Sequence, residues 1–320
     1  MVEEMEDTVA ILMATYNGAK YIEEQIQSII NQTYKNWQLF IRDDGSSDET
    51  LKIIKNFTNI DHRIHKITDN LGNLGPCLNF NELIKTHLEY KYIMFADQDD
   101  VWLVNKIMIS VNKIKNLENF NHNIPVLVYS NYYISNSSLK YKTIVYKNLN
   151  QKHLSERLLI HSWVMGCTSI INSSLAHIAV DIPKEAENHD NWLAILAAAI
   201  GEIGYVKETT MIHRIHEDNV TKNNNTNTLV NRLDRVRKMF LFGLLEKRKL
   251  MQKLNIRLTE TEFEQPLVIK KYQKLLDLKG IHSILYARNN HFYAFTKKRT
   301  FLFYIQLFFS KKRGLENAKR

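Results

Sequence analysis

The sequence predicts an α/β fold, in which a mostly parallel sheet is flanked by helices and followed by a helical C-terminal extension. Three observations lead to this prediction. Short apolar runs of strand length alternate with apolar residues at helical spacing through the first 100 residues. Polar clusters stand directly after three of the predicted strands. An asparagine-rich stretch, KNNNTNT at 222–228, separates this part from a strongly basic segment.

The first 60 residues predict two strand–helix units. Val9–Ala14 and Trp37–Ile41 are short apolar runs of strand type. Apolar residues at helical spacing follow each strand, namely Ile22, Ile26, Ile29 and Ile30 after the first and Leu51, Ile54 and Phe57 after the second. Ser46 and Glu49 form a capping-box pattern, which predicts that the second helix begins there.

Two further strands are expected before residue 100. Arg63–Thr68 is a weak strand signal, whereas Tyr92–Ala96 is apolar throughout. Between them lie the turn LGNLGP at 71–76 and a helix marked by Phe80, Leu83 and Ile84. Strands that alternate with helices in this way are typical of a parallel sheet.

The next 120 residues continue with less regularity. We expect, in order, a strand at Pro125–Ser135, an apolar stretch around Gly166 at 161–172, a helix at 188–201 and a polar segment at 203–220. The helix carries buried-type residues such as Trp192 and presents His189 and Asp190 at its N-terminal end.

The charge is distributed unevenly along the chain. Residues 231–320 carry 22 Lys and Arg against 7 Asp and Glu, whereas residues 1–230 carry 21 against 27. The net charge of +9 therefore combines an acidic body with a basic C-terminal segment. Such an asymmetry favours an anionic partner for the basic segment.

The two cysteines and the length of the apolar runs indicate a cytosolic protein. Cys77 and Cys167 belong to no CxxC or Cys/His cluster, so we expect both to be reduced residues in or near the core. The acidic N-terminus does not match a secretory signal, and no apolar run reaches about 18 residues, so we expect no membrane-spanning helix.

Three polar clusters follow the first, second and fourth predicted strands. They are TYNG at 15–18, RDDGSSDET at 42–50 and DQDD at 97–100. Because the carboxyl ends of neighbouring parallel strands meet at one edge of a sheet, we expect the clusters to converge on a single crevice. The alternative is that each is only a turn rich in Asp and Asn.

These clusters, with FADQDDVW at 95–102, NHDNWLA at 188–194 and HRIHEDNV at 213–220, resemble family 2 glycosyltransferases of the GT-A type. The resemblance covers about residues 8–220 and is greatest to the bacterial rhamnosyltransferase-like branch. It implies a Rossmann-like GT-A fold with a catalytic domain at 1–222. A polar linker at 223–230 and a basic helical region at 231–320 would follow.

The resemblance implies a divalent cation, Mn²⁺ or Mg²⁺, at the DQDD cluster. Asp97 and Asp99 match the DxD motif of the family, with Asp99 as the direct ligand and Asp97 at the ribose or a metal-bound water. His216 is a further candidate ligand. Carboxylate oxygens suit both ions, which also bind substrate phosphates. A calcium EF-hand is excluded because its glycine and its later glutamate are missing. The alternative is a solvated acidic turn.

The resemblance also implies a nucleotide site. Asp44 matches the family position that accepts a hydrogen bond from the pyrimidine ring, and Thr15, Tyr16 and Asn17 would line the base and ribose. Arg214 would contact a phosphate through its forked donors. Asn219 belongs to the same basic segment. Asp43 has a structural alternative, and Asp48 is expected to be a solvated charge at a helix start.

Asp190 is the candidate catalytic base by the same resemblance. Transfer with inversion needs a carboxylate that accepts the proton of the acceptor hydroxyl. Where the family more often has Glu-Asp or Asp-Asp, this sequence has His189-Asp190. Alternatively, Asp190 caps the helix that follows. Gly166, His189 and Trp102 are candidates for the sugar or acceptor site, although Trp102 has a core alternative.

The expected activity is inverting, metal-assisted transfer of a sugar, with dTDP-rhamnose as the favoured donor. A UDP-hexose or UDP-N-acetylhexosamine donor is the alternative within this fold. The expected acceptor is a growing surface polysaccharide or a lipid-linked glycan at the cytoplasmic face of the membrane. A non-catalytic, membrane-associated sugar-nucleotide-binding subunit is the alternative from another class.

The basic tail predicts a peripheral contact with an anionic membrane. Residues 231–250 have an amphipathic basic pattern, and TFLFYIQLFF at 300–309 lies between the basic triplets Lys297–Arg299 and Lys311–Arg313. Ten residues are too few to span a bilayer but suit an interfacial helix. The alternatives are ordinary core packing and a homodimer interface. Nucleic-acid binding has no recognised motif behind it.

Overall fold

The computed structural model describes residues 7–119, 124–140, 142–147, 149–217 and 229–309, without the side chains of 229–243. The chain forms two compact units. The first comprises Met1–Gln151, Val164–Ile182 and Ala186–Lys222, and the second comprises Lys152–Trp163, Pro183–Glu185 and Asn223–Arg320.

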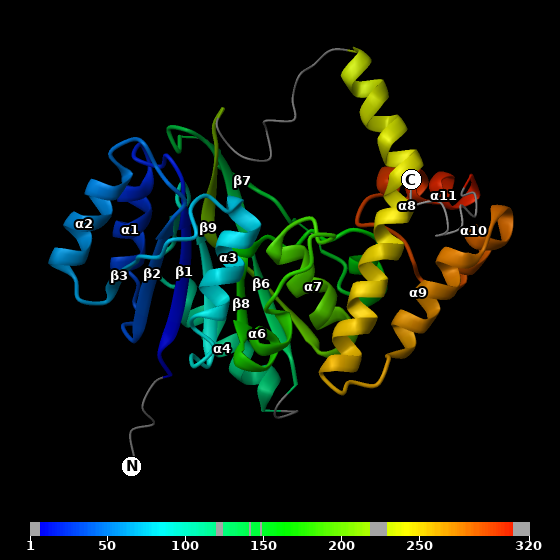
Figure 1. Cartoon of the computed structure of the whole chain (residues 1–320), viewed down its shortest axis with the longest axis horizontal. Helices are drawn as coiled ribbons and strands as arrows, with labels where there is room; N and C mark the ends of the chain where they lie inside the picture. The colour runs from blue at the N-terminus through cyan, green and yellow to red at the C-terminus, as the bar shows by residue number, and fades with distance from the viewer. Residues whose placement is uncertain (1–6, 120–123, 141, 148, 218–228, 310–320) are drawn as a thin grey trace. The chain divides into compact units, whose positions relative to one another are not determined.

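A mixed sheet forms the centre of the first unit (Figure 1). Its strands are β1 (Val9–Thr15), β2 (Trp37–Asp43), β3 (Ile64–Ile67), β4 (Tyr92–Asp97), β5 (Val101–Trp102), β6 (Val126–Asn136), β7 (Lys142–Ile144), β8 (Ser169–Asn172) and β9 (Glu202–Ile215). The spatial order is β3-β2-β1-β4-β8-β6-β9-β5, and β7 pairs with β6. The strands β1 to β4 pair in parallel, whereas β8 is antiparallel to both of its neighbours.

Helices flank this sheet in the first unit. They are α1 (Ile22–Ile30), α2 (Thr50–Ile60), α3 (Gly75–Lys85), α4 (Lys106–Glu118), the 3₁₀ turn η1 (Gly166–Thr168), α6 (Ser173–Ala179) and α7 (His189–Ile200). Because helices cover the sheet, its central strands are apolar on both faces. Residues 9–13 of β1 and 92–96 of β4 are accordingly 0% exposed. Full burial of one such aliphatic side chain stabilises the fold by about 1.5–3 kcal/mol.

The four strands expected before residue 100 are confirmed, but the predicted start of α2 is wrong. The helix begins at Thr50, and neither Ser46 nor Glu49 caps it. Ser46 instead donates its hydroxyl to Asp43, at 2.6 Å. The N-cap position is Glu49, whose side chain forms no cap hydrogen bond, and Asp48 accepts from the amide of Thr50 through Oδ1 at 3.0 Å.

The second unit is helical. Its helices are α5 (Leu154–Ile160), α8 (Leu229–Glu260), α9 (Leu267–Asp277), α10 (Gly280–Asn289) and α11 (Lys297–Phe308). Leu254, Ile269, Tyr272 and Phe292 form part of its core. The Nζ of Lys247 donates to the carbonyl of Ile160 at 2.6 Å. Residues 152–163, which the sequence placed with the catalytic domain, therefore pack with the C-terminal helices.

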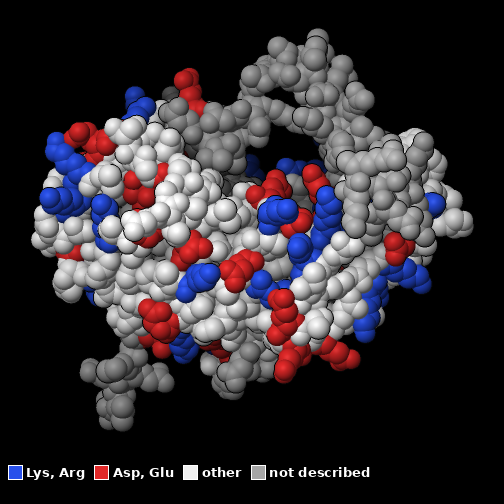
Figure 2. Space-filling model, in the orientation of Figure 1, with Lys and Arg blue, Asp and Glu red and all other residues white. Residues whose placement is uncertain are grey.

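Parts of the sequence-based expectations lie outside the described residues. These parts are linker residues 223–228, Asn219 and the basic triplet Lys311–Arg313. Within the described helices, none combines the length and the apolar character that crossing a bilayer requires. Cys167 is buried and Cys77 is partly exposed, and both are free thiols. On the face in Figure 2, basic and acidic side chains are interspersed.

Candidate active site

The loops that follow β1 and β4 are joined by a pair of hydrogen bonds. Gln98 accepts from the amide of Tyr16 through Oε1 and donates to the carbonyl of Tyr16 through Nε2, both at 2.9 Å. Gly18 permits this approach, because a Cβ there would lie 2.2 Å from Oε1 of Gln98. The TYNG loop is thereby fixed to the DQDD loop.

The loops that follow β1 and β2 are joined as well. Asn17 has a left-handed backbone, with φ of 48°, and its amide donates to Oγ of Ser46 at 2.8 Å. The Oδ1 of Asn17 accepts from the amide of Ser47 at 2.8 Å. The amide of Gly18 donates to Oγ1 of Thr50, also at 2.8 Å. The expected convergence of the three polar clusters is therefore confirmed.

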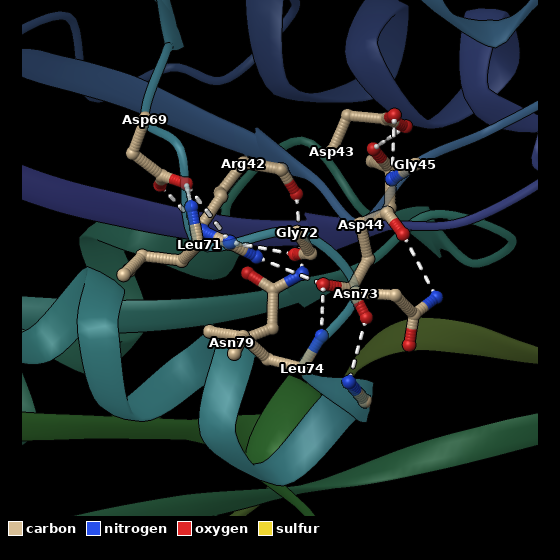
Figure 3. A network of polar contacts seen from close by, with 12 residues as sticks. Arg42, Asp43, Asp44, Gly45, Asp69, Leu71, Gly72, Asn73, Leu74 and Asn79 are labelled. Atoms are coloured by element: carbon tan, nitrogen blue, oxygen red, sulfur yellow. Dashed lines mark hydrogen bonds and ion pairs between the residues drawn. The ribbon is translucent and has the colours of Figure 1, made fainter.

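Asp44 lies in a buried network below these loops (Figure 3). Its carboxylate accepts from Nη1 of Arg42 at 2.9 Å and from the amides of Leu74 and Gly75 at 2.8 and 2.7 Å. Arg42 also forms a forked pair with Asp69, at 2.7 and 3.1 Å. The exposed fractions of Arg42 and Asp44 are 2% and 3%. Asp44 thus fixes the start of α3 relative to the end of β2.

Thr15 and Tyr16 differ sharply in exposure. Thr15 is 2% exposed and donates its hydroxyl to Oδ1 of Asp43 at 2.9 Å. Asp43 also accepts from the amides of Gly45 and Ser46, which supports its structural alternative. The ring of Tyr16 is 52% exposed and offers an aromatic surface at the edge of the sheet.

Asp99 and His216 meet although 117 positions separate them in the sequence. The Nε2 of His216 lies 2.7 Å from Oδ2 of Asp99. Burial and the neighbouring Asp100 raise the pKa of Asp99, while the hydrogen bond from His216 opposes that rise. A carboxylate oxygen and an imidazole nitrogen are both ligand types that suit Mn²⁺.

Asp100 connects the DQDD loop to the end of β9. Its Oδ1 accepts from Nδ1 of His213 at 2.9 Å and from the amide of Arg214 at 3.2 Å. Burial disfavours the charged imidazolium, but the carboxylate of Asp100 outweighs this effect and raises the pKa of His213 to about 9. A charged pair therefore holds the two segments together at neutral pH.

Arg214 forms further contacts where the end of β9 meets the DQDD loop. It is 3% exposed, donates through Nε to the carbonyl of Asp99 at 2.8 Å and through Nη1 to the carbonyl of Ser137 at 2.5 Å. Its Nη2 pairs with the carboxylate of Glu24. These donors, which the resemblance assigned to a phosphate, contact the protein itself in this structure.

A second group of potential ligands lies deeper. Atoms of Asp97, Asp100, Cys167 and His213 all lie within 4.8 Å of one another. Burial raises the pKa of Asp97 to about 7 and lowers that of the nearby Lys106, which is 0% exposed, to about 8. Two carboxylates facing His213 and Lys106 are already balanced in charge. The Asp99–His216 pair therefore fits a cation better than this group does.

Asp190 lies in the first turn of α7, where the positive end of the helix dipole favours a carboxylate. Its Oδ2 accepts from the amide of Gly166 at 3.1 Å. His189 is buried against the rings of Phe80 and Phe95, and burial lowers the pKa of its imidazole. The structure thus places two of the acceptor-site candidates, Gly166 and His189, directly beside Asp190.

Trp102, in contrast, belongs to the core. Its side chain is 2% exposed, and its amide donates to Oγ of Ser28 at 3.0 Å. This burial supports the core alternative for Trp102. Sequence reasoning also missed Gln98 and Lys106. Gln98 stands inside the DQDD motif, but nothing local to Lys106 signals full burial.

Comparisons with known proteins agree with this geometry. The sequence model described as "Glycosyl transferase family 2" matches residues 10–173. The dTDP-rhamnosyl transferase RfbG of Shigella flexneri is 33% identical over 221 residues, covering 65% of this chain and 72% of the relative. The UDP-Glc:alpha-D-GlcNAc-diphosphoundecaprenol beta-1,3-glucosyltransferase WfgD of Escherichia coli is 30% identical over 190 residues, covering 59% and 69%.

A solved structure shares the fold at low sequence identity. The crystal structure of GalNAc-T7 with UDP, GalNAc and Mn²⁺ superposes with a TM-score of 0.56 and 14% identity. The match covers 91% of this chain and 59% of that chain. At this identity the likeness concerns the fold alone.

Proposed function

Because the chain belongs to glycosyltransferase family 2 and has its GT-A fold, we propose that it transfers a sugar from a nucleoside diphosphate sugar to an acceptor hydroxyl with inversion. The observation that carries the proposal is the Asp99–His216 pair, at 2.7 Å, beside three loops that are hydrogen-bonded to one another. A solvated acidic turn would not require the histidine that follows β9 or a glutamine clamp.

The donor nucleotide would bind along the loops after β1 and β2. The exposed ring of Tyr16 can stack on a base, and Thr15 and Asn17 hold the loop that carries it. Asp44 accepts one protein hydrogen bond at Oδ2, from Gly75, which leaves a lone pair for a pyrimidine N–H. For Arg214 to contact a phosphate, Glu24 is the partner that can give way, since its side chain is 52% exposed.

Asp190 would act as the general base. One carboxylate oxygen is held by the amide of Gly166, so the other can accept the proton of the acceptor hydroxyl. The acceptor oxygen then forms a bond to the anomeric carbon while the bond from that carbon to the diphosphate oxygen breaks. The electron pair leaves with the nucleoside diphosphate. Attack opposite the leaving group inverts the anomeric configuration.

Asp99 and His216 are the residues that would hold the divalent cation, Mn²⁺ or Mg²⁺, with Asp97 at the ribose or a metal-bound water. When bound, the cation would supply Lewis-acid stabilisation of the negative charge that develops on the diphosphate. Asp100, His213 and the carbonyl contact of Arg214 would keep Asp99 and His216 in place without touching the donor.

The favoured donor is dTDP-rhamnose, because RfbG, whose name specifies dTDP-rhamnosyl transfer, is 33% identical to this chain. WfgD, whose name specifies UDP-Glc, supports the alternative of a UDP-hexose or UDP-N-acetylhexosamine donor. The acceptor in the name of WfgD, a GlcNAc-diphosphoundecaprenol, supports a lipid-linked glycan or growing polysaccharide as acceptor here. A non-catalytic sugar-nucleotide-binding subunit would lack any dependence on Asp190.

The proposed location is the cytoplasmic face of the membrane, with the second unit in contact with anionic lipid. Phe301 and Phe308 stand seven positions apart on α11 and are 64% and 45% exposed. Lys297 and Lys298 are exposed at the start of the same helix. Exposed aromatics with adjacent lysines are typical of interfacial helices. A homodimer through this face is the alternative, although it would bring like charges together.

Calorimetric titration with dTDP and with UDP, each with and without Mn²⁺, tests the donor site. Wild-type protein should bind at least one nucleotide more tightly with Mn²⁺, and Asp99→Ala should lose that dependence. Asp190→Asn should bind nucleotide normally but fail to release it from the sugar nucleotide. Absence of binding by either nucleotide under every metal condition would refute the proposal.

A further inference from the structure

The turn η1 contacts both parts of the proposed catalytic apparatus through two consecutive residues. Gly166 holds Asp190, and Cys167 lies against Asp97. We propose that this turn sets the position of the acceptor base relative to the donor site, with Gly166 and Cys167 as positioning residues. The inference rests on the proposed function, because it concerns the spacing between Asp190, the proposed base, and Asp97, the first aspartate of the DxD motif.

The Gly166 side depends on the lack of a side chain. A Cβ at this position would lie 2.3 Å from Nε2 of His189, well inside van der Waals contact. The imidazole cannot simply move away, because its ring centroid lies 4.1 Å from that of Phe80 and 5.2 Å from that of Phe95. Glycine therefore lets the turn approach α7 closely enough for its amide to reach Asp190.

His189 fills space here and forms no polar contact through its outer nitrogen. It is 7% exposed, and its Nε2 has no hydrogen-bond partner among the described residues. Burying an unpaired nitrogen of a neutral imidazole costs free energy. We therefore infer that His189 stands at this position because of its packing. The ring lies close to Gly166, because a Cβ there would be 2.3 Å from its Nε2.

The Cys167 side faces the donor site. Its thiol is 1% exposed and lies within 4.8 Å of carboxylate oxygens of both Asp97 and Asp100. The thiol thus contacts the first aspartate of the DxD motif from the interior of the unit.

The turn between these contacts is rigid. The carbonyl of Met165 accepts from the amide of Thr168 at 3.0 Å, from its Oγ1 at 2.8 Å and from Oγ of Ser169 at 2.8 Å. The next residues form β8, in which Ile170 pairs with Met94 of β4, the strand that ends in Asp97. The Cα atoms of Gly166 and Cys167 are neighbours in the chain and therefore about 3.8 Å apart, so the backbone fixes the distance between the two contacts.

The variant Gly166→Ala tests the inference, with release of dTDP from dTDP-rhamnose and of UDP from UDP-glucose as probe reactions. The added methyl should displace the base and lower kcat by roughly ten- to hundredfold, as expected for a misplacement of about 1 Å. The donor KM and the calorimetric Kd for dTDP or UDP should stay within about twofold, because Gly166 takes no part in the hydrogen bonds that join the nucleotide loops to one another.

The double variant Gly166→Ala/His189→Ala supplies a rescue. Removing the imidazole makes room for the methyl, so the double variant should have a higher kcat than Gly166→Ala alone. Gly204→Ala is the matched control, because its added Cβ would also be crowded, at 2.7 Å from Cδ1 of Leu117. Gly204 stands near the start of β9, far from the site. It should lower thermal stability and leave kcat unchanged.

Cys167→Ala keeps the inference testable if Gly166→Ala does not fold. Loss of the thiol contact should lower kcat severalfold while the protein still binds Mn²⁺ and nucleotide. A wild-type kcat in either folded variant overturns the inference but not the proposed function. A loss of nucleotide affinity that matches the loss of kcat has the same meaning. If wild-type protein binds neither nucleotide, the proposed function fails and the inference fails with it.

Discussion

The Nδ1 of His213 lies 2.9 Å from Oδ1 of Asp100, a carboxylate that is 0% exposed. Through this contact the end of β9 is held against the loop after β4. The adjacent residues, Arg214 and Asp99, repeat the connection through the Nε of one and the carbonyl of the other. The meeting of His216 with Asp99 is a consequence of these contacts, because the chain between 213 and 216 has little freedom left.

Removing one partner of this pair should destabilise the first unit. The variant His213→Ala leaves the buried carboxylate of Asp100 without its cation, and loss of one partner of a buried pair costs about 3–5 kcal/mol. Urea denaturation measures the change in the free energy of unfolding. Glu49→Gln breaks the exposed Glu49–Lys52 pair and is the matched control, expected to leave stability nearly unchanged.

The same pair predicts how stability depends on pH in the metal-free protein. The pKa of His213 is raised from 6.5 to about 9 in the folded state, so its stabilisation is complete below the unfolded value and is lost as pH rises toward 9. The pKa of Asp97 is about 7 and that of Lys106 about 8. Between pH 7 and pH 8 the change in stability with pH therefore comes mainly from His213.

Urea denaturation with a chelator present should therefore show the free energy of unfolding falling by about 1 kcal/mol per pH unit in this interval. In His213→Gln the fall should disappear. A wild-type stability that stays constant or increases between the two pH values would contradict the charged state assigned to His213.

The network around Asp44 predicts that its loss affects both fold and nucleotide binding. Asp44→Ala leaves the amides of Leu74 and Gly75 without their acceptor and should lower stability by about 2–4 kcal/mol. Binding of dTDP or UDP should weaken at least tenfold. Asp69→Asn retains the Arg42–Asp44 contact and should reduce binding much less. Equal losses in the two variants would argue against a direct role of Asp44.

The exposed face of α11 predicts binding to anionic vesicles. In the double variant Phe301→Ser/Phe308→Ser, co-sedimentation with vesicles of phosphatidylglycerol and phosphatidylcholine should fall severalfold, because about 0.8 kcal/mol is lost for each CH₂ that no longer enters the interface. Ile60→Ser removes an apolar residue of the first unit that is even more exposed, at 78%, and is the control. Unchanged vesicle binding together with loss of a dimer would favour the homodimer alternative.

Local patterns were sufficient for much of the fold. Apolar runs such as 92–96 are buried on both faces of a parallel sheet, and that demand is visible in the composition of the segment itself. The convergence of the loops after β1, β2 and β4 follows from the geometry of parallel strands. The cap of α2 was predicted wrongly because Ser46 bonds to Asp43 and Asn17, and such competition depends on neighbouring loops.

The sequence by itself determined the fold class, the motifs at the ends of the strands, and the helical nature of the basic C-terminal region. Only the tertiary structure decided that Gln98 clamps Tyr16, that Trp102 is core, that Lys106 is buried and that residues 152–163 pack with the C-terminal helices. The physical reason is range. Periodicity reports what one segment needs from its surroundings, whereas these four features depend on which distant segment satisfies that need.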